Sequence, residues 1–208
     1  FSKIKNCIIL EGNIYDEYPV FNSEKTECED FYDLNSYVYE YYKEKIVQEV
    51  LDVFEKLNIE YNLIRHPAIF CRADEEKVKG IDFGGVVCKN LFLKDKKANK
   101  FYLVSLPVEK RANLKKISDE LESARLSFGN DDELWENLHI KSGSVSVLNV
   151  IGAPNTEVTF VIDKDILNLP KVSFHPNDNT ASICFSPNEI TKIMDKYNKK
   201  YIFLEVEE

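Results

Sequence analysis

Cysteine is scarce, and the few cysteines do not form a pattern that binds metal or builds a disulfide framework. The 208 residues hold five of them, an odd number, and no two form a CxxC pair: Cys7, Cys28, Cys71, Cys88 and Cys184. Zinc sites and disulfide-rich domains need close or regular spacing. We therefore expect no metal, no disulfides, and a cytoplasmic protein with reduced thiols.

Long apolar runs and familiar catalytic signatures are missing too. No stretch approaches the roughly 20 apolar residues that cross a bilayer, so no membrane partner is expected. Residues 1–10 have an apolar tail but lack an A-x-A-like cleavage site, which argues against a secretory signal. HExxH, GxGxxG, P-loop and Ser/His/Asp signatures do not occur. The commonest hydrolase and nucleotide-binding motifs are thus excluded, and no cofactor is predicted.

The charge is strongly acidic overall but unevenly distributed. A net charge of −9 normally disfavours a nucleic-acid partner. Residues 1–60 hold 14 acidic and 6 basic residues, a net of −8, so the rest of the chain is nearly neutral. Residues 86–116 hold nine basic and two acidic residues, a local net of +7. This run is either a phosphate-binding footprint or, more commonly for such patterns, a solvated turn and helix face.

Apolar spacing predicts an α+β fold. Apolar residues recur every three or four positions over 35–57, which indicates a helix. Further helices are predicted at 73–80, 113–123, 131–138 and 187–197, the last capped by Ser186. Strands are predicted at 60–65, 86–94, 101–106, 158–162, 171–174, 181–185 and 201–204. Without regular βαβ alternation, this order indicates a mixed, largely antiparallel sheet flanked by helices.

A lysine interrupts the second of these strands. Lys89 stands in the middle of VVCKNLFL, residues 86–93. Burying an ammonium group is costly unless it is paired. Such a lysine either reaches the surface or faces a pocket that takes an anionic ligand. The alternative is an edge-strand lysine that discourages aggregation.

Two loops offer groups that can contact a ligand. Residues 141–146 place small side chains around Gly143, where backbone groups can approach a ligand closely. Residues 175–180 form a polar loop in which His175 can bind, catalyse or hold the turn. Simple turns explain most such segments. His66 and His139 stand near the ends of predicted elements, and we interpret both as structural.

Taken in order, several segments match a known family. They are HPAIF at 66–70, KNLFLKDKK at 89–97, LSF at 126–128, SGSVS at 142–146 and HPNDNT at 175–180. With these segments the sequence resembles the YbaK/ProX superfamily of aminoacyl-tRNA editing domains, most closely the ProXp-ala branch and the PrdX proteins. The resemblance does not reach the acidic, tyrosine-rich N-terminus. We therefore predict an extension at 1–45 and an editing domain at 46–208.

The resemblance implies roles for individual residues. Lys89 would be essential and hold the 3′-terminal nucleotide of a tRNA, and Asn90 would shape the same end. Gly143 and Ser144 would present catalytic backbone groups to the ester and the attacking water. The other predicted substrate contacts are Val145, Ser146, Val147, His175 and Asn179. The basic run supplies the predicted tRNA contacts Lys94, Lys96, Lys97, Lys100, Lys110 and Arg111.

The activity that the resemblance implies is trans-editing, the hydrolysis of the ester in Ala-tRNA(Pro). The family needs no metal, and a ribose hydroxyl of the tRNA assists the water. Cys-tRNA(Pro) is the alternative substrate, and a non-catalytic tRNA-binding or regulatory module of the same fold is the contrasting class. The expected partners are the acceptor end of an aminoacylated tRNA and, as a second partner to test, prolyl-tRNA synthetase.

Two details set this sequence apart from the pattern of the branch. Val147 stands where the GxxxP motif has proline, which would fix φ and remove a donor. In a regular strand, Lys89 and Asn90 point to opposite faces. Both side chains can then face one pocket only if the strand begins or bulges at this point.

Overall fold

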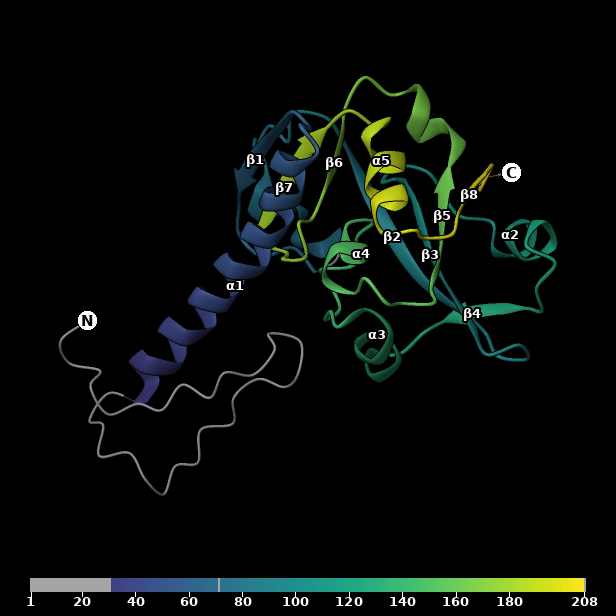
Figure 1. Cartoon of the computed structure of the whole chain (residues 1–208), viewed down its shortest axis with the longest axis horizontal. Coiled ribbons are helices and arrows are strands. Elements are labelled where there is room, and N and C mark those ends of the chain that lie inside the picture. The colour runs from purple at the N-terminus through teal and green to yellow at the C-terminus, as the bar shows by residue number, and fades with distance from the viewer. Residues whose placement is uncertain (1–30, 71, 208) are drawn as a thin grey trace. The chain divides into compact units, whose positions relative to one another are not determined.

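One mixed sheet of eight strands carries the fold (Figure 1). The computed structural model describes residues 31–70 and 72–207. The strand order is β1-β7-β6-β2-β3-β5-β8, and β4 pairs with β2 beside this path. The strands are β1 (Tyr61–Arg65), β2 (Val86–Asp95), β3 (Lys100–Pro107), β4 (Leu126–Phe128), β5 (Thr159–Asp163), β6 (Val172–Phe174), β7 (Ala181–Phe185) and β8 (Tyr201–Leu204).

The pairing of the strands confirms the predicted fold class. The pairs β1–β7, β2–β3, β2–β4 and β6–β7 are antiparallel. The pairs β2–β6, β3–β5 and β5–β8 are parallel. The sheet is therefore mixed and largely antiparallel, with helices beside it. β4 escaped prediction because a strand of three residues is too short to show an alternating pattern.

The helices follow the predicted periodicity. They are α1 (Phe31–Lys56), α2 (Leu114–Glu120), α3 (Asp131–Leu138), α4 (Asn149–Gly152) and α5 (Glu189–Lys196), with 3₁₀ helices η1 (Arg72–Val78) and η2 (Lys164–Asn168). In α1, Val50, Val53 and Phe54 are buried, as their spacing predicts. Asn58 follows with a φ of 52°, the left-handed conformation that commonly ends a helix.

The predicted start of the last helix is wrong. The carbonyl groups of Ser186 and Pro187 accept hydrogen bonds from the N–H groups three residues later, so these residues form a turn. α5 begins at Glu189, and its N-cap residue, Asn188, makes no side-chain capping bond. The serine therefore closes the preceding turn through its backbone and does not cap the helix with its side chain.

The predicted extension is only partly within the described residues. Residues 1–30 lie outside them, as does Cys71, so the loop predicted in the acidic segment and three of the five cysteines have no structural account. Cys88 and Cys184 are buried free thiols. α1 runs through the predicted boundary at residue 45 as one helix. The division into extension and domain stays a prediction.

Alternation along the strands divides the core into two hydrophobic clusters. Phe92, Leu103 and Phe160 belong to one cluster, which also contains residues of α1, α4 and α5. Leu93 and Val104, their chain neighbours, belong to the other, which α2 completes. Successive strand residues point to opposite faces, so the central strands β2, β3 and β5 have both faces covered.

Candidate functional site

Lys89 and Asn90 stand in a regular stretch of β2. The register with β3 is unbroken from Cys88 to Asp95, so the strand has no bulge between the two residues. Their side chains therefore lie on opposite faces of the sheet. Lys89 Nζ donates to the carbonyl oxygen of Val108, just beyond β3, at 2.8 Å. Asn90 Oδ1 accepts a hydrogen bond from Ser105 Oγ at 2.6 Å. The two side chains do not converge on one pocket.

One edge of β2 has no neighbouring strand at this point. On the side away from β3, β6 pairs with residues 86–87 and β4 with residues 93–95, and no described strand fills the interval. Val108 N–H donates to Val87 O, so the odd-numbered residues of β2 direct their backbone groups towards β3. The even-numbered residues face the other way, as shown by the hydrogen bond from Gly129 N–H to Phe92 O. The backbone of Asn90 therefore faces the gap.

His175 directly follows β6, the strand that pairs with the start of β2. Val87 pairs with Ser173 in the parallel strands β2 and β6, and Lys89 and His175 each follow two residues later. His175 Nδ1 is 2.8 Å from the carbonyl oxygen of Ala181, so Nδ1 carries the proton and Nε2 is the acceptor of the neutral ring. Burial lowers the pKa of His175 and outweighs the hydrogen bond to Ala181, which raises it. The ring is therefore neutral at pH 7.

A second histidine, which sequence reasoning interpreted only as structural, lies beside His175. His66 is buried, and its ring centroid is 5.7 Å from that of His175. His66 Nδ1 is 2.9 Å from the carbonyl oxygen of Pro67, so the Ser182 hydroxyl, 2.9 Å from Nε2, donates to that nitrogen. His66 and Ser182 are 116 residues apart, and no local pattern indicates their contact.

The glycine loop, residues 142–147, lies against the histidine loop, residues 175–180. Gly143 has a φ of +92°, and a Cβ at this position would lie 2.8 Å from Phe70 Cδ1 and 3.1 Å from Asn179 Nδ2. Only glycine fits here without strain or displacement. The structure therefore brings together two predicted site residues, Gly143 and Asn179, and adds Phe70, which was not a predicted contact.

Asn149, at the start of α4, connects the two loops. Its Oδ1 accepts a hydrogen bond from Ser146 N–H at 2.7 Å. Its Nδ2 donates to the carbonyl oxygen of Ser144 at 3.3 Å and to Asn177 Oδ1 at 2.9 Å. Both amide atoms of this buried side chain are therefore occupied, and the glycine loop is fixed in place. Sequence reasoning missed Asn149 because its partners are set by tertiary structure.

Some backbone N–H groups of the glycine loop hold the loop by hydrogen bonds, and others make no hydrogen bond within the described residues. Ser144 N–H donates to Lys141 O at 3.1 Å, so this predicted catalytic residue holds a turn. Val147 is 1% exposed and packs in the core, so only its backbone can meet a ligand. Within the residues that the structure describes, the N–H groups of Gly143 and Val145 have no intramolecular acceptor. These two N–H groups are available to bind an oxyanion.

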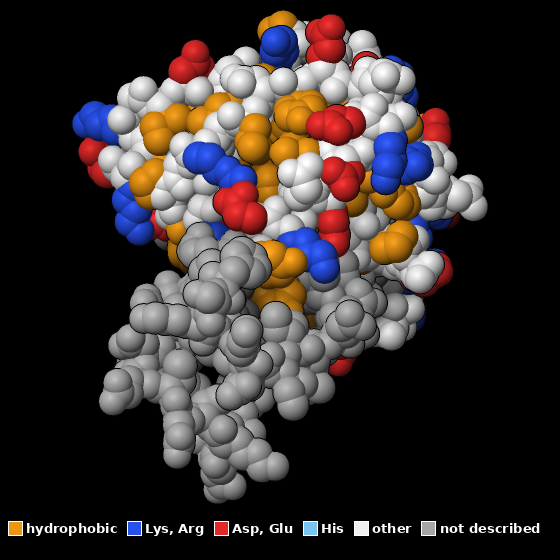
Figure 2. Space-filling model, turned by 60° about the vertical axis from the view of Figure 1, so that its left-hand side comes forward, with side chains coloured by type: hydrophobic (Ala, Val, Ile, Leu, Met, Phe, Trp, Pro, Cys, Tyr) orange, Lys and Arg blue, Asp and Glu red, His pale blue; other side chains and the backbone are white. Residues whose placement is uncertain are grey.

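The predicted tRNA contacts fall into two groups. Lys94 forms an ion pair with Glu133, and Lys110 lies 2.7 Å from both Asp163 and Asp165. Burial alone would lower the pKa of Lys110, but hydrogen bonds to the two aspartates raise it. Positive charge at Lys94 and Lys110 is thus largely neutralised within the protein. The others are exposed: Lys96, Lys97, Lys100 and Arg111. Figure 2 shows basic, acidic and apolar side chains interspersed over the described part of the face that it presents.

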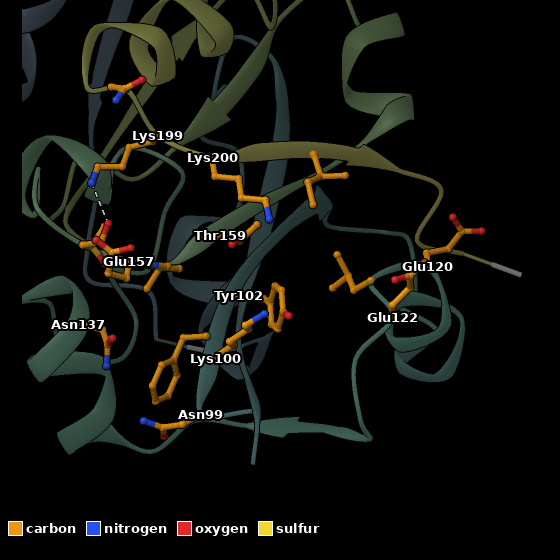
Figure 3. Close-up of a pocket in the computed structure, with 16 residues that line it drawn as sticks. Asn99, Lys100, Tyr102, Glu120, Glu122, Asn137, Glu157, Thr159, Lys199 and Lys200 are labelled. Carbon is orange, nitrogen blue, oxygen red and sulfur yellow. Dashed lines mark hydrogen bonds between the residues drawn. The ribbon is translucent and has the colours of Figure 1, made fainter. Parts of the chain in front are cut away.

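A groove of about 650 Å³ lies away from these loops, where β3, β5 and β8 begin (Figure 3). Lys100, Lys199 and Lys200 line it together with Glu120, Glu122 and Glu157. Lys100 is the one predicted site residue in its lining. Because β2 and β3 are antiparallel, this end of β3 is opposite to the end that pairs with Lys89. The groove is therefore separate from the candidate site.

Among the residues with described side chains, no three His, Cys, Asp or Glu residues are grouped so as to hold a metal ion. None of the helices in the described part of the chain has the length and hydropathy needed to cross a bilayer.

Comparison with known proteins places these loops and strands in a family. The model of the aminoacyl-tRNA editing domain matches residues 66–193. The prolyl-tRNA editing protein ProX of Acetoanaerobium sticklandii is 34% identical over 149 residues, which cover 71% of this chain and 89% of that protein. Prolyl-tRNA synthetase associated domain-containing protein 1 of Xenopus laevis is 31% identical over 154 residues, which cover 72% and 90% of the two chains.

The fold is shared with solved structures as well. A candidate trans-editing enzyme for prolyl tRNA synthetase superposes with a TM-score of 0.58 at 19% identity, over 78% of this chain and 97% of that chain. At this identity the likeness shows the fold alone. The resemblance inferred from the sequence motifs is confirmed. The chain belongs to the family of aminoacyl-tRNA editing domains, in the ProX-like branch of the YbaK/ProX superfamily.

Proposed function

We propose that the protein is an aminoacyl-tRNA deacylase that acts in trans on mischarged tRNA(Pro), with alanine as the preferred amino acid. The observation that carries the proposal is the glycine loop, which Asn149 fixes: the N–H groups of Gly143 and Val145 make no hydrogen bond within the described residues, and Gly143 lies beside Asn179. Family membership and the ProX relative, a prolyl-tRNA editing protein, support the reaction class. The segments KNLFLKDKK and HPNDNT, which resemble those of the ProXp-ala branch, support alanine over cysteine. The name of the Xenopus laevis relative supports prolyl-tRNA synthetase as a second partner.

The proposed reaction is the hydrolysis of one ester. Water attacks the carbonyl carbon of the aminoacyl ester, and the bond from that carbon to the ribose oxygen breaks. The ribose oxygen takes up a proton that the attacking water has lost. The N–H groups of Gly143 and Val145 stabilise the developing oxyanion, and such a donor is worth about 3 kcal/mol in other enzymes. Neutral His175 offers Nε2 to the α-ammonium group of the amino acid. Lys89 anchors the terminal nucleotide and acts by orientation, as the neighbouring ribose hydroxyl assists the water.

Incubation with a panel of charged tRNAs tests this function. We expect Ala-tRNA(Pro) to lose its amino acid fastest, Cys-tRNA(Pro) more slowly, and Pro-tRNA(Pro) at the rate of the buffer control. Release of labelled amino acid is the measurement. If cysteine is released faster than alanine, Cys-tRNA(Pro) is the preferred substrate. No release from any of the three would contradict the enzyme and leave a tRNA-binding module.

We propose that the lysines at the β2–β3 turn, Lys96, Lys97 and Lys100, contact phosphates of the acceptor end. Reversing their charge together should raise KM for Ala-tRNA(Pro) about tenfold or more and change kcat little, because these contacts lie away from the ester. Each lost contact lowers the salt dependence of log Kd by about 0.7 on a single strand. Binding is measured between 50 and 200 mM salt.

The matched control reverses three exposed lysines elsewhere, Lys56, Lys164 and Lys196. Equal losses of affinity in the two triple variants would mean that only net charge matters. Unchanged affinity for tRNA in the variant of Lys96, Lys97 and Lys100 would mean that the β2–β3 turn does not contact the tRNA.

A further inference from the structure

Phe70 is a large apolar side chain that the fold leaves open to solvent. It is 63% exposed, whereas its backbone is held on two sides. Its N–H donates to Asp74 Oδ2 at 2.9 Å, and the preceding N–H, of Ile69, donates to the carbonyl oxygen of Asn179 at 3.1 Å. Asp74 is itself paired with Lys77 at 2.6 Å. The exposed ring is therefore presented from a fixed backbone.

The ring of Phe70 lies against the glycine loop. A Cβ at residue 143 would come within 2.8 Å of Phe70 Cδ1 and 3.4 Å of Phe70 Cα, so the ring edge and the glycine backbone are in direct contact. The large hydrophobic side chains exposed in the described residues are Tyr41, Phe70, Val86 and Phe128. Of these four, Phe70 is the one that touches the glycine loop. A single exposed apolar side chain is common on protein surfaces, so the position of Phe70 against the glycine loop, and not its exposure alone, carries the inference.

We propose that Phe70 is a stacking platform for the unpaired base at the 3′ end of the tRNA. The inference rests on the proposed function, because the ester that the glycine loop would bind is carried by the ribose of that terminal nucleotide. The base is joined to the same ribose, so a single sugar separates it from the ester held by the oxyanion donors Gly143 and Val145. An aromatic ring binds the π-face of a base without reading its edge, and Phe70 has no polar group to do more.

The test uses an uncharged RNA minihelix with a single-stranded 3′ end and 2-aminopurine at its last position. Stacking quenches this fluorophore, so wild-type protein should quench it on binding. Phe70→Ala should abolish the quench and weaken binding about tenfold, which lies within the range that one stacked base contributes. Phe70→Trp should keep both signals. Phe70→Leu, which keeps the apolar volume but has no π-system, should lose the quench.

Phe128→Ala is the matched control, because Phe128 is also 63% exposed but lies on β4. It should bind and quench like wild type. A second minihelix that lacks the terminal nucleotide should bind wild-type protein and Phe70→Ala with equal affinity.

The inference is overturned if Phe70→Ala quenches the fluorophore as strongly as the wild-type protein does. It is also overturned if Phe128→Ala loses as much quenching and affinity as Phe70→Ala, or if the wild-type protein binds neither minihelix. An effect of Phe70→Ala on prolyl-tRNA synthetase binding alone would also overturn it in favour of a protein contact. The minihelix carries no ester, so the result is independent of the deacylase assay. Stacking without hydrolysis would leave this inference standing and remove the proposed function.

Discussion

Lys89→Ala is expected to lower kcat/KM for Ala-tRNA(Pro) about a hundredfold in a protein that stays folded. The side chain is half-buried, and Lys89 follows Val87 by two residues as His175 follows its strand partner Ser173. Its ammonium donates to Val108 O at 2.8 Å, which fixes its position beside the end of β3. A hydrogen bond to a charged group is worth about 1.5–3 kcal/mol, and about 1.4 kcal/mol corresponds to a factor of ten. Single-turnover deacylation measures the effect, and thermal unfolding checks the fold.

Lys116→Ala is the matched control for this substitution. Lys116 is 32% exposed, and its Nζ also donates to a backbone carbonyl, that of Glu207, at 2.6 Å. The Lys116→Ala substitution removes the same kind of hydrogen bond from α2, a helix outside the candidate site. Lys89→Met keeps the apolar stem and should be as inactive as Lys89→Ala. Full activity in folded Lys89→Ala, or an equal loss in Lys116→Ala, would remove Lys89 from the site.

Gly143→Ala is expected to reduce kcat/KM to a similar extent and to lower the free energy of unfolding as well. A φ of +92° strains an alanine, and a left-handed conformation costs an L-residue about 1–2 kcal/mol. The new methyl group would also meet Phe70 Cδ1 at 2.8 Å and Asn179 Nδ2 at 3.1 Å. Either the side chains of Phe70 and Asn179 or the glycine loop itself must then shift, and we expect the strain at residue 143 to displace the N–H groups proposed for the oxyanion. The measurements are single-turnover deacylation and urea unfolding.

Gly80→Ala separates the two causes. Gly80 has a similar φ of +85°, but a Cβ there meets nothing within 4 Å. This variant should show the loss of stability without the loss of activity. If both variants are equally inactive, backbone strain alone explains the effect. If Gly143→Ala is fully active, the glycine loop does not bind the ester.

Local patterns were sufficient for most of the fold. Three features depend only on neighbours in the chain, so the sequence displays them: the alternation in β2 and β3, the three-and-four spacing of Val50 and Phe54, and the bounds of α3, predicted at 131–138. The motifs also identified the two loops and the strand that carries Lys89. Short elements escaped prediction, because α4 has four residues and β4 three, which is too few for a period to appear. The predicted start of α5 was wrong because Ser186 and Pro187 form a turn before the helix.

The detailed geometry of the site could not be predicted in the same way. The hydrogen bond of Asn149 to Asn177 spans 28 residues, and that of His66 to Ser182 spans 116. Lys110 is paired with aspartates and not left for a phosphate because β5 places Asp163 beside it, and Asp163 is far from Lys110 in the sequence. These contacts follow from packing of the whole sheet. Their residue types are common in turns, so no local signal distinguishes them.

The pairing of β1 has a consequence for synthesis of the chain on the ribosome. β1 pairs with β7, and the corresponding residues Arg65 and Ala181 are more than a hundred positions apart. At about 5–20 residues per second, a ribosome needs roughly 6–23 s to make the intervening segment. During that time β1 and His66 have no partner, whereas the β2–β3 hairpin can already form. The histidine loop also emerges late, so a nascent chain lacks the candidate site until β7 is complete.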